Sequence, residues 1–206
     1  MVWGSLLSTP FALTAFLFIP EYWSPPSLFN WAQRYGISIE DVVWSAAVGG
    51  IASAVSEIAF HERLERVRTM APKPRYLPLV AVVALIVVLE LMWPARSIYN
   101  AMIALAAGAA LIAWIRRDLT GRMLRGAAIF AAVYMVLFVY FLAMYPDFIA
   151  RYYNTAGLWG RYILGVPIEE PLFAYAGGAV WCVMYEYMQG YRLVSFRPVR
   201  FARQGS

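Results

Sequence analysis

Charged residues, cysteine and histidine are scarce in this 206-residue chain. Asp, Glu, Lys and Arg together make up 14% of it, against roughly 25% in soluble domains, while 62% of its residues are hydrophobic. The single cysteine, Cys182, excludes an intramolecular disulfide bond and a metal site built from thiolates. The single histidine, His61, argues against a histidine-based catalytic dyad or metal cluster.

Two cofactor-binding motifs are also missing. Asp41, Asp118 and Asp147 are the only aspartates, so the chain lacks the aspartate-rich motif with which a membrane prenyltransferase holds magnesium and diphosphate. No Gly-x-Gly-x-x-Gly sequence follows a strand, so a flavin or nicotinamide site of the Rossmann type is not expected. We therefore expect neither a metal nor a cofactor. The net charge of +5 lies in short segments between apolar runs, a placement typical of a membrane protein and not of a nucleic-acid-binding one.

The hydrophobic residues gather in long runs. Each run approaches the roughly 20 residues that an α-helix needs to cross a bilayer. The runs cover about residues 3–19, 39–60, 77–93, 97–115, 126–145 and 167–189. The sequence therefore predicts an all-α integral membrane protein with about six transmembrane helices in one membrane domain.

Two of these runs begin alike. GISIEDVVWSAAVGGIASAVSE starts at Gly36, and GVPIEEPLFAYAGGAVWCVMYE starts 129 residues later, at Gly165. The residues brought into register without a gap include Glu40 with Glu169, Asp41 with Glu170, Trp44 with Phe173, Gly49 with Gly178 and Glu57 with Glu186. A register of this length predicts an internal duplication. We expect a first repeat over residues 1–76, central spans over 77–125 and a second repeat over 126–206.

The topology follows from counting spans and basic residues. Four predicted spans separate the starts of the two similar helices, so both acid pairs enter the membrane from the same side and the repeat is parallel. Thirteen of the 17 Lys and Arg residues lie on the opposite side. Because cytoplasmic loops carry an excess of Lys and Arg, we expect an integral cell-membrane protein with both termini in the cytoplasm.

The paired carboxylates have an ordinary explanation. Proline and glutamate are favoured in the first turn of a helix, and Ser38 with Asp41 resembles a capping box. Two features favour a functional interpretation: both pairs occupy the same register of a duplication, and apolar membrane sequence follows each of them. Carboxylates entering a bilayer cost a few kcal/mol each and usually serve a function.

The two carboxylates of each pair are expected to have different roles. Adjacent residues on a helix point about 100° apart, so one carboxylate can accept hydrogen bonds at the helix start while its neighbour faces a cavity. A neutral carboxylic acid inside a membrane is a general acid, and in apolar surroundings its target is an alkene or a lipid-like polar group. Five aromatic residues are candidates for stabilising a carbocation, although membrane packing is the commoner role of any one such residue: Trp44, Phe173, Tyr175, Trp181 and Tyr185, with Trp44 and Phe173 favoured. Glu90, at the same membrane side as both pairs, is a candidate third member of the cluster.

The sequence from Leu164 to Phe173, LGVPIEEPLF, resembles the lycopene cyclase domain. That domain occurs in heterodimeric bacterial carotenoid cyclases and, fused in tandem, in archaeal and fungal ones. The resemblance implies a cofactor-free, non-redox isomerase that protonates a terminal double bond of a carotene and then loses a proton to leave a ring. It assigns the paired acids to Glu169 and Glu170 and, in the other copy, to Glu40 and Asp41. The first copy departs from the family's pattern at Ser38 in place of proline, at Asp41 and at Trp44.

Other functions remain open from the sequence. An intramembrane glutamic protease would have an arginine four residues after its acid pair, where this chain has Ala174. A transporter or assembly subunit would have broken helices and polar residues along a path, and the predicted central spans have almost none. An enzyme acting on another isoprenoid lipid fits the same features. The expected partners are a lipophilic isoprenoid and the bilayer, with a homo-oligomer left open.

Overall fold

The computed structural model describes residues 2–60, 63–66 and 74–194, and most of them are helical. The longer helices are α4 (Ile39–Phe60), α5 (Leu77–Met92), α6 (Ser97–Ile115), α7 (Thr120–Met144) and α9 (Glu169–Gln189). The N-terminal run forms α1 (Val2–Ser8), the 3₁₀ segment η1 (Thr9–Thr14) and α2 (Ala15–Phe18). The short elements are η2 (Leu28–Asn30), α3 (Trp31–Tyr35), β1 (Arg63–Arg66), η4 (Arg117–Leu119), α8 (Phe148–Tyr152), η5 (Thr155–Gly157), β2 (Tyr162–Ile163), β3 (Val166–Pro167) and β4 (Tyr191–Val194).

Each predicted span lies on helical structure, but not every one has the character of a membrane span. Among the described residues, the helices over Ser97–Ile115 and Arg117–Met144 are long and apolar enough to cross a bilayer. A third span results if Leu28–Tyr35 and Ile39–Val55, bent by 89°, count as one. The apolar helices over Val2–Phe18 and Leu77–Met92 are shorter. The protein is thus a helical protein with membrane-spanning character, and the number six stays a prediction.

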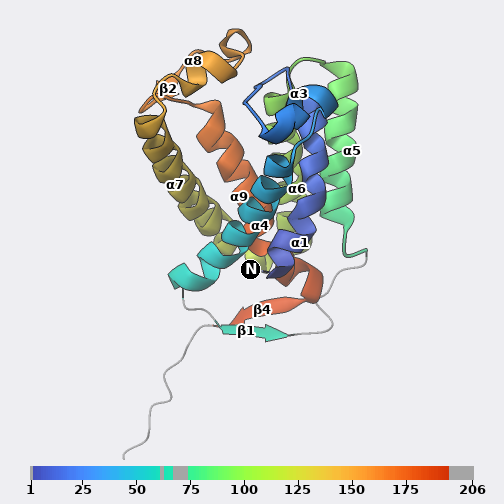
Figure 1. Cartoon of the computed structure of the whole chain (residues 1–206). Coiled ribbons are helices and arrows are strands. Elements are labelled where there is room, and N and C mark those ends of the chain that lie inside the picture. Colours follow the sequence, from blue (N-terminus) through green and yellow to red (C-terminus); the bar gives the residue numbers. More distant parts are fainter. Residues whose placement is uncertain (1, 61–62, 67–73, 195–206) are drawn as a thin grey trace, which may run out of the picture.

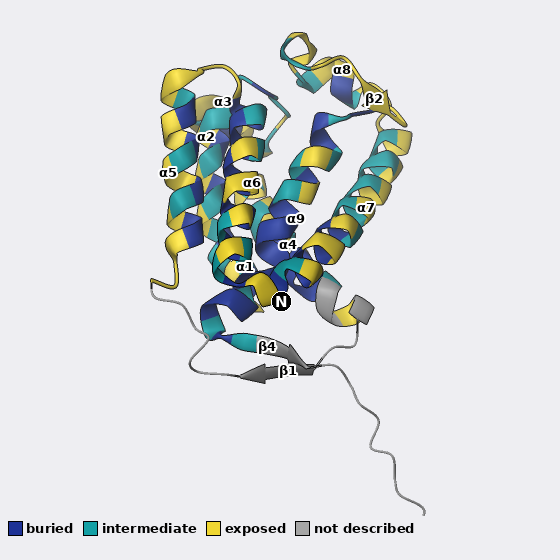
Figure 2. Cartoon of the chain, turned by 180° about the vertical axis from the view of Figure 1, so that it is seen from behind, coloured by how far each residue is buried: buried dark blue, intermediate teal, exposed yellow. Residues whose placement is uncertain are grey.

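The N-terminal run and α9 depart from the expected spans for different reasons. Pro10 lies at the start of η1, where a proline cannot donate a backbone hydrogen bond and disturbs a continuous α-helix. α9 packs against α4, α6 and α7 and is the most buried helix (Figure 2). Because protein covers much of its surface, α9 can carry glutamates, which are costly on a lipid-facing helix surface.

The two similar helices occupy related positions. α4 and α9 both begin at the end of the molecule where α3 and α8 lie and both run toward the β1–β4 end (Figure 1). There β1 pairs antiparallel with β4, and Leu64 lies opposite Leu193, its counterpart at the 129-residue offset. Gly36 and Gly165, also counterparts, both adopt positive φ before their helices. A two-fold axis between parallel repeats would produce such an arrangement, but the duplication and the repeat boundaries stay predictions.

The packing of α1 on α4 requires glycine. A Cβ atom on Gly49 would lie 2.4 Å from Ser8 Cβ and 2.6 Å from the carbonyl oxygen of Gly4. A Cβ atom on Gly4 would in turn lie 2.5 Å from the carbonyl oxygen of Gly49. Because both carbonyls belong to helix backbones, an added methyl group cannot be accommodated by a side-chain rotation. The two helices would have to separate.

Gly49→Ala is therefore expected to destabilise the protein by about 1–3 kcal/mol, the usual cost of overpacking a well-packed interface. The matched control is Gly121→Ala near the start of α7, where an added Cβ meets no atom within 4 Å. Thermal unfolding of both purified variants in detergent measures the difference. Equal unfolding temperatures would contradict the close packing of α1 on α4.

A buried ion pair joins α7 to α9 at the end remote from the acid pairs. Arg122 Nη2 lies 2.8 Å from Glu186 Oε1, and the two side chains are 0% and 3% exposed. Removing one partner of a buried pair takes from the other buried charge its closest opposite charge, which is strongly destabilising. By contrast, the ion pair of Arg151 with Asp147 lies on the surface, with side chains 67% and 69% exposed.

Arg122→Met is expected to destabilise the protein by about 3–5 kcal/mol, because Glu186 would be left charged and buried. Arg151→Met is expected to change stability by about 0–1 kcal/mol, as is usual for an exposed pair. Unfolding of both variants under the same detergent conditions compares the two directly. A small effect of Arg122→Met would contradict a stabilising role for this ion pair.

Candidate functional site

A tight hairpin positions the acid pair at the start of α9. β2 and β3 pair antiparallel, and the two residues that connect them, Leu164 and Gly165, both have positive φ. This is the backbone conformation of the two-residue turns that join neighbouring strands. The hairpin ends at Pro167, so that Glu169 and Glu170 become the first two residues of α9, where negative charge complements the helix dipole.

Three tyrosine hydroxyl groups from separate segments surround the carboxyl group of Glu170. Tyr22 and Tyr153 donate to its Oε1 atom at 2.7 and 2.9 Å, and Tyr134 of α7 donates to its Oε2 atom. The side chain itself is 4% exposed. Both carboxyl oxygens therefore have hydrogen-bond partners although the group is buried.

The loops that carry Tyr22 and Tyr153 are held together by their backbones. Ser24 N donates to the carbonyl of Tyr152 at 2.8 Å, and Asn154 N donates to the carbonyl of Tyr22 at 2.9 Å. Burial, followed by the neighbouring Glu170, raises the pKa of both the Tyr22 and the Tyr153 hydroxyl. The two phenols therefore stay protonated and act as hydrogen-bond donors at neutral pH.

Glu170 forms part of the wall of a cavity of about 430 Å³. The size lies within the usual range of small-molecule sites, about 300–1,000 Å³. Apolar and aromatic residues of the N-terminal helices, α4, α6, α7 and α9 make up most of the wall. α9 contributes one face of its helix, with residues spaced by three or four: Glu170, Phe173, Ala174, Gly177 and Trp181.

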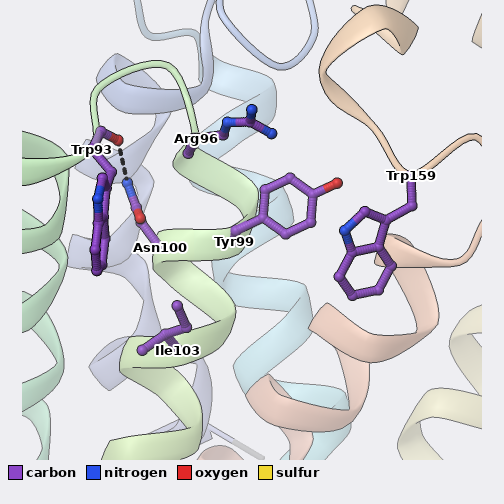
Figure 3. Close-up of a pocket in the computed structure, with 6 residues that line it drawn as sticks. All are labelled: Trp93, Arg96, Tyr99, Asn100, Ile103 and Trp159. Carbon is purple, nitrogen blue, oxygen red and sulfur yellow. Dashed lines mark hydrogen bonds between the residues drawn. The ribbon is translucent and has the colours of Figure 1, made fainter.

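Glu169 points away from this cavity. Its Oε1 atom accepts hydrogen bonds from the Tyr99 hydroxyl at 2.8 Å and from the Trp159 backbone N–H at 2.6 Å. Its Oε2 atom is buried and has no hydrogen-bond partner among the described residues. The rings of Tyr99 and Trp159 lie next to each other, with centroids 5.3 Å apart, and line a separate pocket of about 200 Å³ together with Arg96 and Asn100 (Figure 3).

In the first acid pair, too, one carboxylate faces the cavity and the other does not. Asp41 lines the same cavity as Glu170, and its Oδ2 atom accepts the backbone N–H and the hydroxyl of Ser38, both at 2.7 Å. Glu40 is exposed, and its Oε1 atom accepts the Leu28 N–H at 2.6 Å. In each pair the second acid faces the cavity, while the first accepts a backbone N–H from the preceding loop.

The remaining candidates separate into two groups. Trp44 and Phe173 line the cavity, as their matched positions in the two helices predict. Tyr175 does not line it and is 37% exposed, because it lies off the face of α9 that Glu170 and Phe173 share. Glu90 lies beside the smaller pocket, where its Oε1 atom accepts a hydrogen bond from Asn100 at 3.0 Å. The structure therefore places Glu90 apart from the cluster around Glu170.

Sequence reasoning missed the three tyrosines around Glu170. Tyr134 offered a signal, since it places a hydroxyl group within an otherwise apolar run that needs a partner in a membrane. Tyr22 and Tyr153 lie in aromatic loops, where membrane proteins commonly carry tyrosine, and offered no such signal.

The comparisons with known proteins point to one family. The model of the family described as lycopene cyclase matches residues 96–188, which cover α6, α7 and nearly all of α9, with Glu169 and Glu170. The first acid pair lies outside the match. Comparisons with curated proteins and with solved structures gave no match. The match identifies residues 96–188 as a segment similar to the lycopene cyclase domain.

Proposed function

We propose that this protein is a carotenoid end-group cyclase, which converts a linear lycopene-type end into a ring. The observation that carries the proposal is the position of Glu170. This buried carboxyl lies in the segment similar to the lycopene cyclase domain and forms part of the wall of a largely apolar cavity. An apolar cavity suits a hydrocarbon end, and a carboxyl group within it is suited to transfer a proton to an alkene.

The reaction begins with proton transfer from Glu170. The neutral carboxyl gives its proton to the less substituted carbon of the last C=C bond, whose π electrons form the new C–H bond. A tertiary cation remains on the neighbouring carbon. The π electrons of a nearby double bond in the same chain then form the C–C bond that closes the ring and carry the positive charge into it.

A second proton transfer completes the reaction. The ring cation loses a proton from an adjacent carbon to a carboxylate, and the electrons of that C–H bond form the ring double bond. Because one proton is gained and one is lost, the net change is an isomerisation, and no electrons are exchanged with a redox cofactor.

The three tyrosines stabilise Glu170 once it has lost its proton. Tyr22, Tyr134 and Tyr153 are already aimed at its oxygens, so negative charge that develops on the carboxyl meets fixed donors without reorganisation. A carboxylate held in this way is a counter-ion for the cation and an acceptor for the returning proton.

The first repeat supplies the other half of the site. Asp41, held by Ser38, adds a second carboxylate to the cavity wall and attracts the cation. The rings of Trp44 and Phe173 add their π faces. We assign Glu169 and Glu40 to a positioning role, since each holds the loop before its helix by a backbone N–H and neither lines the cavity.

The site would lie toward the outer side of the membrane. The excess of Lys and Arg in the sequence segments predicted on the side opposite the acid pairs supports cytoplasmic termini, with both acid pairs toward the outer side. The substrate would reach the site from the bilayer, where carotenoids dissolve.

The acids are tested by extracting pigment from lycopene-producing bacteria that express the chain. Glu170→Gln is expected to abolish ring formation, since glutamine cannot donate the proton, and Asp41→Asn to reduce it at least about tenfold. Glu169→Gln is expected to keep part of the activity, because the amide oxygen still accepts the Tyr99 and Trp159 hydrogen bonds.

The control is Asp147→Asn, a surface carboxylate that is expected to leave the pigments unchanged. Inactive Glu169→Gln beside active Glu170→Gln would reverse the assignment of the acid. Unchanged lycopene with well-expressed wild-type protein would reject lycopene cyclisation and favour another isoprenoid lipid or a non-catalytic role.

Filling the cavity provides a test that leaves every acid in place. Gly177 lines the cavity, and a Cβ atom there would meet no atom within 4 Å. Gly177→Leu is expected to fold but to lower ring formation at least about tenfold, because its side chain occupies the space of the substrate. Gly121→Leu, at an equally open position remote from the cavity, should cyclise normally. The ringed carotene extracted from cells, divided by the measured protein level, compares the two variants. Full activity of Gly177→Leu would mean that the substrate does not bind in this cavity.

A further inference from the structure

The cavity is too small for a whole carotenoid. Its volume is about 430 Å³, and on α9 its lining extends from Glu170 to Trp181, roughly 16 Å along the helix axis. An extended forty-carbon polyene is on the order of the thickness of the hydrocarbon core, about 30 Å. If the proposed function holds, one end of the molecule lies in the cavity while most of the chain lies outside it. The cavity therefore needs an opening through which the chain can pass.

Two wall residues mark such an opening. Of the residues that line the cavity, only Trp44 of α4 and Leu137 of α7 are exposed, by 50% and 55%. Both are apolar, and so are their exposed neighbours Val43 and Val136. The opening therefore faces a surface suited to lipid chains and not to water.

The helices that carry these two residues separate on the side of the acids. α4 and α7 lie close together toward the β1–β4 end and diverge toward the end with α3 and α8 (Figure 1). Beside this opening the Trp44 and Tyr134 rings make an edge-to-face contact, with centroids 5.9 Å apart. Because Tyr134 also donates its hydroxyl hydrogen bond to Glu170, the opening is one side chain away from the acid.

One face of α7 forms a continuous surface from the opening into the cavity. Tyr134, Leu137, Phe138 and Phe141 recur at helical spacing, and all four line the cavity. Neighbouring Val136 does not line the cavity and is 69% exposed. Leu137 is thus the residue of α7 that belongs both to the cavity wall and to the outer surface.

We propose that the gap between α4 and α7, bordered by Trp44 and Leu137, is a lateral portal through which one end of a linear isoprenoid enters from the bilayer. The rest of the polyene stays among the lipid chains. Each time an isoprenoid molecule binds, only the end that lies in the cavity is cyclised. A product with two rings forms only after the one-ring product leaves the cavity and returns with its other end.

The test narrows the portal without touching the acids. Leu137→Trp places a bulky ring at the opening, whereas Leu137→Ala widens it. Val136→Trp is the matched control, since it adds the same ring to the lipid-facing side of the same helix. In lycopene-producing bacteria, Leu137→Trp is expected to lower ring formation on the order of tenfold and to raise the share of one-ring product. Val136→Trp should stay within about twofold of wild type, and Leu137→Ala is expected to form more rings than Leu137→Trp.

A binding measurement makes the test independent of catalysis. Each variant is combined with Glu170→Gln, purified from the same bacteria in lipid nanodiscs, and the retained carotenoid is measured by its absorbance per protein. The Leu137→Trp protein is expected to retain on the order of tenfold less pigment than the Val136→Trp protein.

If the Leu137→Trp and Val136→Trp proteins retained equal amounts of carotenoid, the portal proposal would be overturned, whether or not the wild type forms rings. Equal loss of retention in Leu137→Trp and Leu137→Ala would also overturn it, because Leu137 would then act by contact inside the site. Absence of rings with the wild type would reject the proposed function alone, and pigment retention would still decide the portal.

Discussion

The architecture depends on keeping one carboxyl group, that of Glu170, inside an apolar interior. A buried polar group without partners is costly, and the fold supplies three hydroxyl donors from segments that are distant in sequence. Tyr22 follows the N-terminal helices, Tyr134 lies on α7, and Tyr153 follows α8. To bring them together, the loops before α3 and after α8 pair through their backbones. The central place of α9 follows from the same requirement.

The cavity combines a reactive group with surroundings that suit reactive intermediates. A carbocation is quenched by water, and a wall made mainly of apolar and aromatic side chains excludes water while offering π faces. The two acid-bearing helices contribute equivalent positions, with Asp41 and Glu170 facing the space and Glu40 and Glu169 turned to their own loops. The proposed chemistry thus uses both helices, although the family match covers only the second.

The sequence predicted the helices well where local rules decide. The run over Ser97–Ile115 is apolar beyond its first turn, and the helix has the predicted bounds. The N-terminal run was less predictable, because Pro10 interrupts a stretch that hydrophobicity alone would join into one span. For α9, the length was predicted, but its central position was not, since composition does not reveal whether lipid or protein covers a helix. Tyr175 illustrates this limit: it was chosen for its aromatic ring, while the helical spacing from Glu170 directs its side chain elsewhere.

The sequence by itself determined the helical membrane class, the acid pairs at two helix starts, and the resemblance to the lycopene cyclase domain that the family match confirms. These features are local, set by hydrophobicity, by the residues favoured in a first helical turn and by a motif contiguous in the chain. Only the tertiary structure decided which acid of each pair faces the cavity, which tyrosines surround Glu170, and where α4 and α7 part to leave Trp44 and Leu137 exposed. Those features arise from contacts between segments as much as 148 residues apart, as between Tyr22 and Glu170, and residue type and spacing do not specify such contacts.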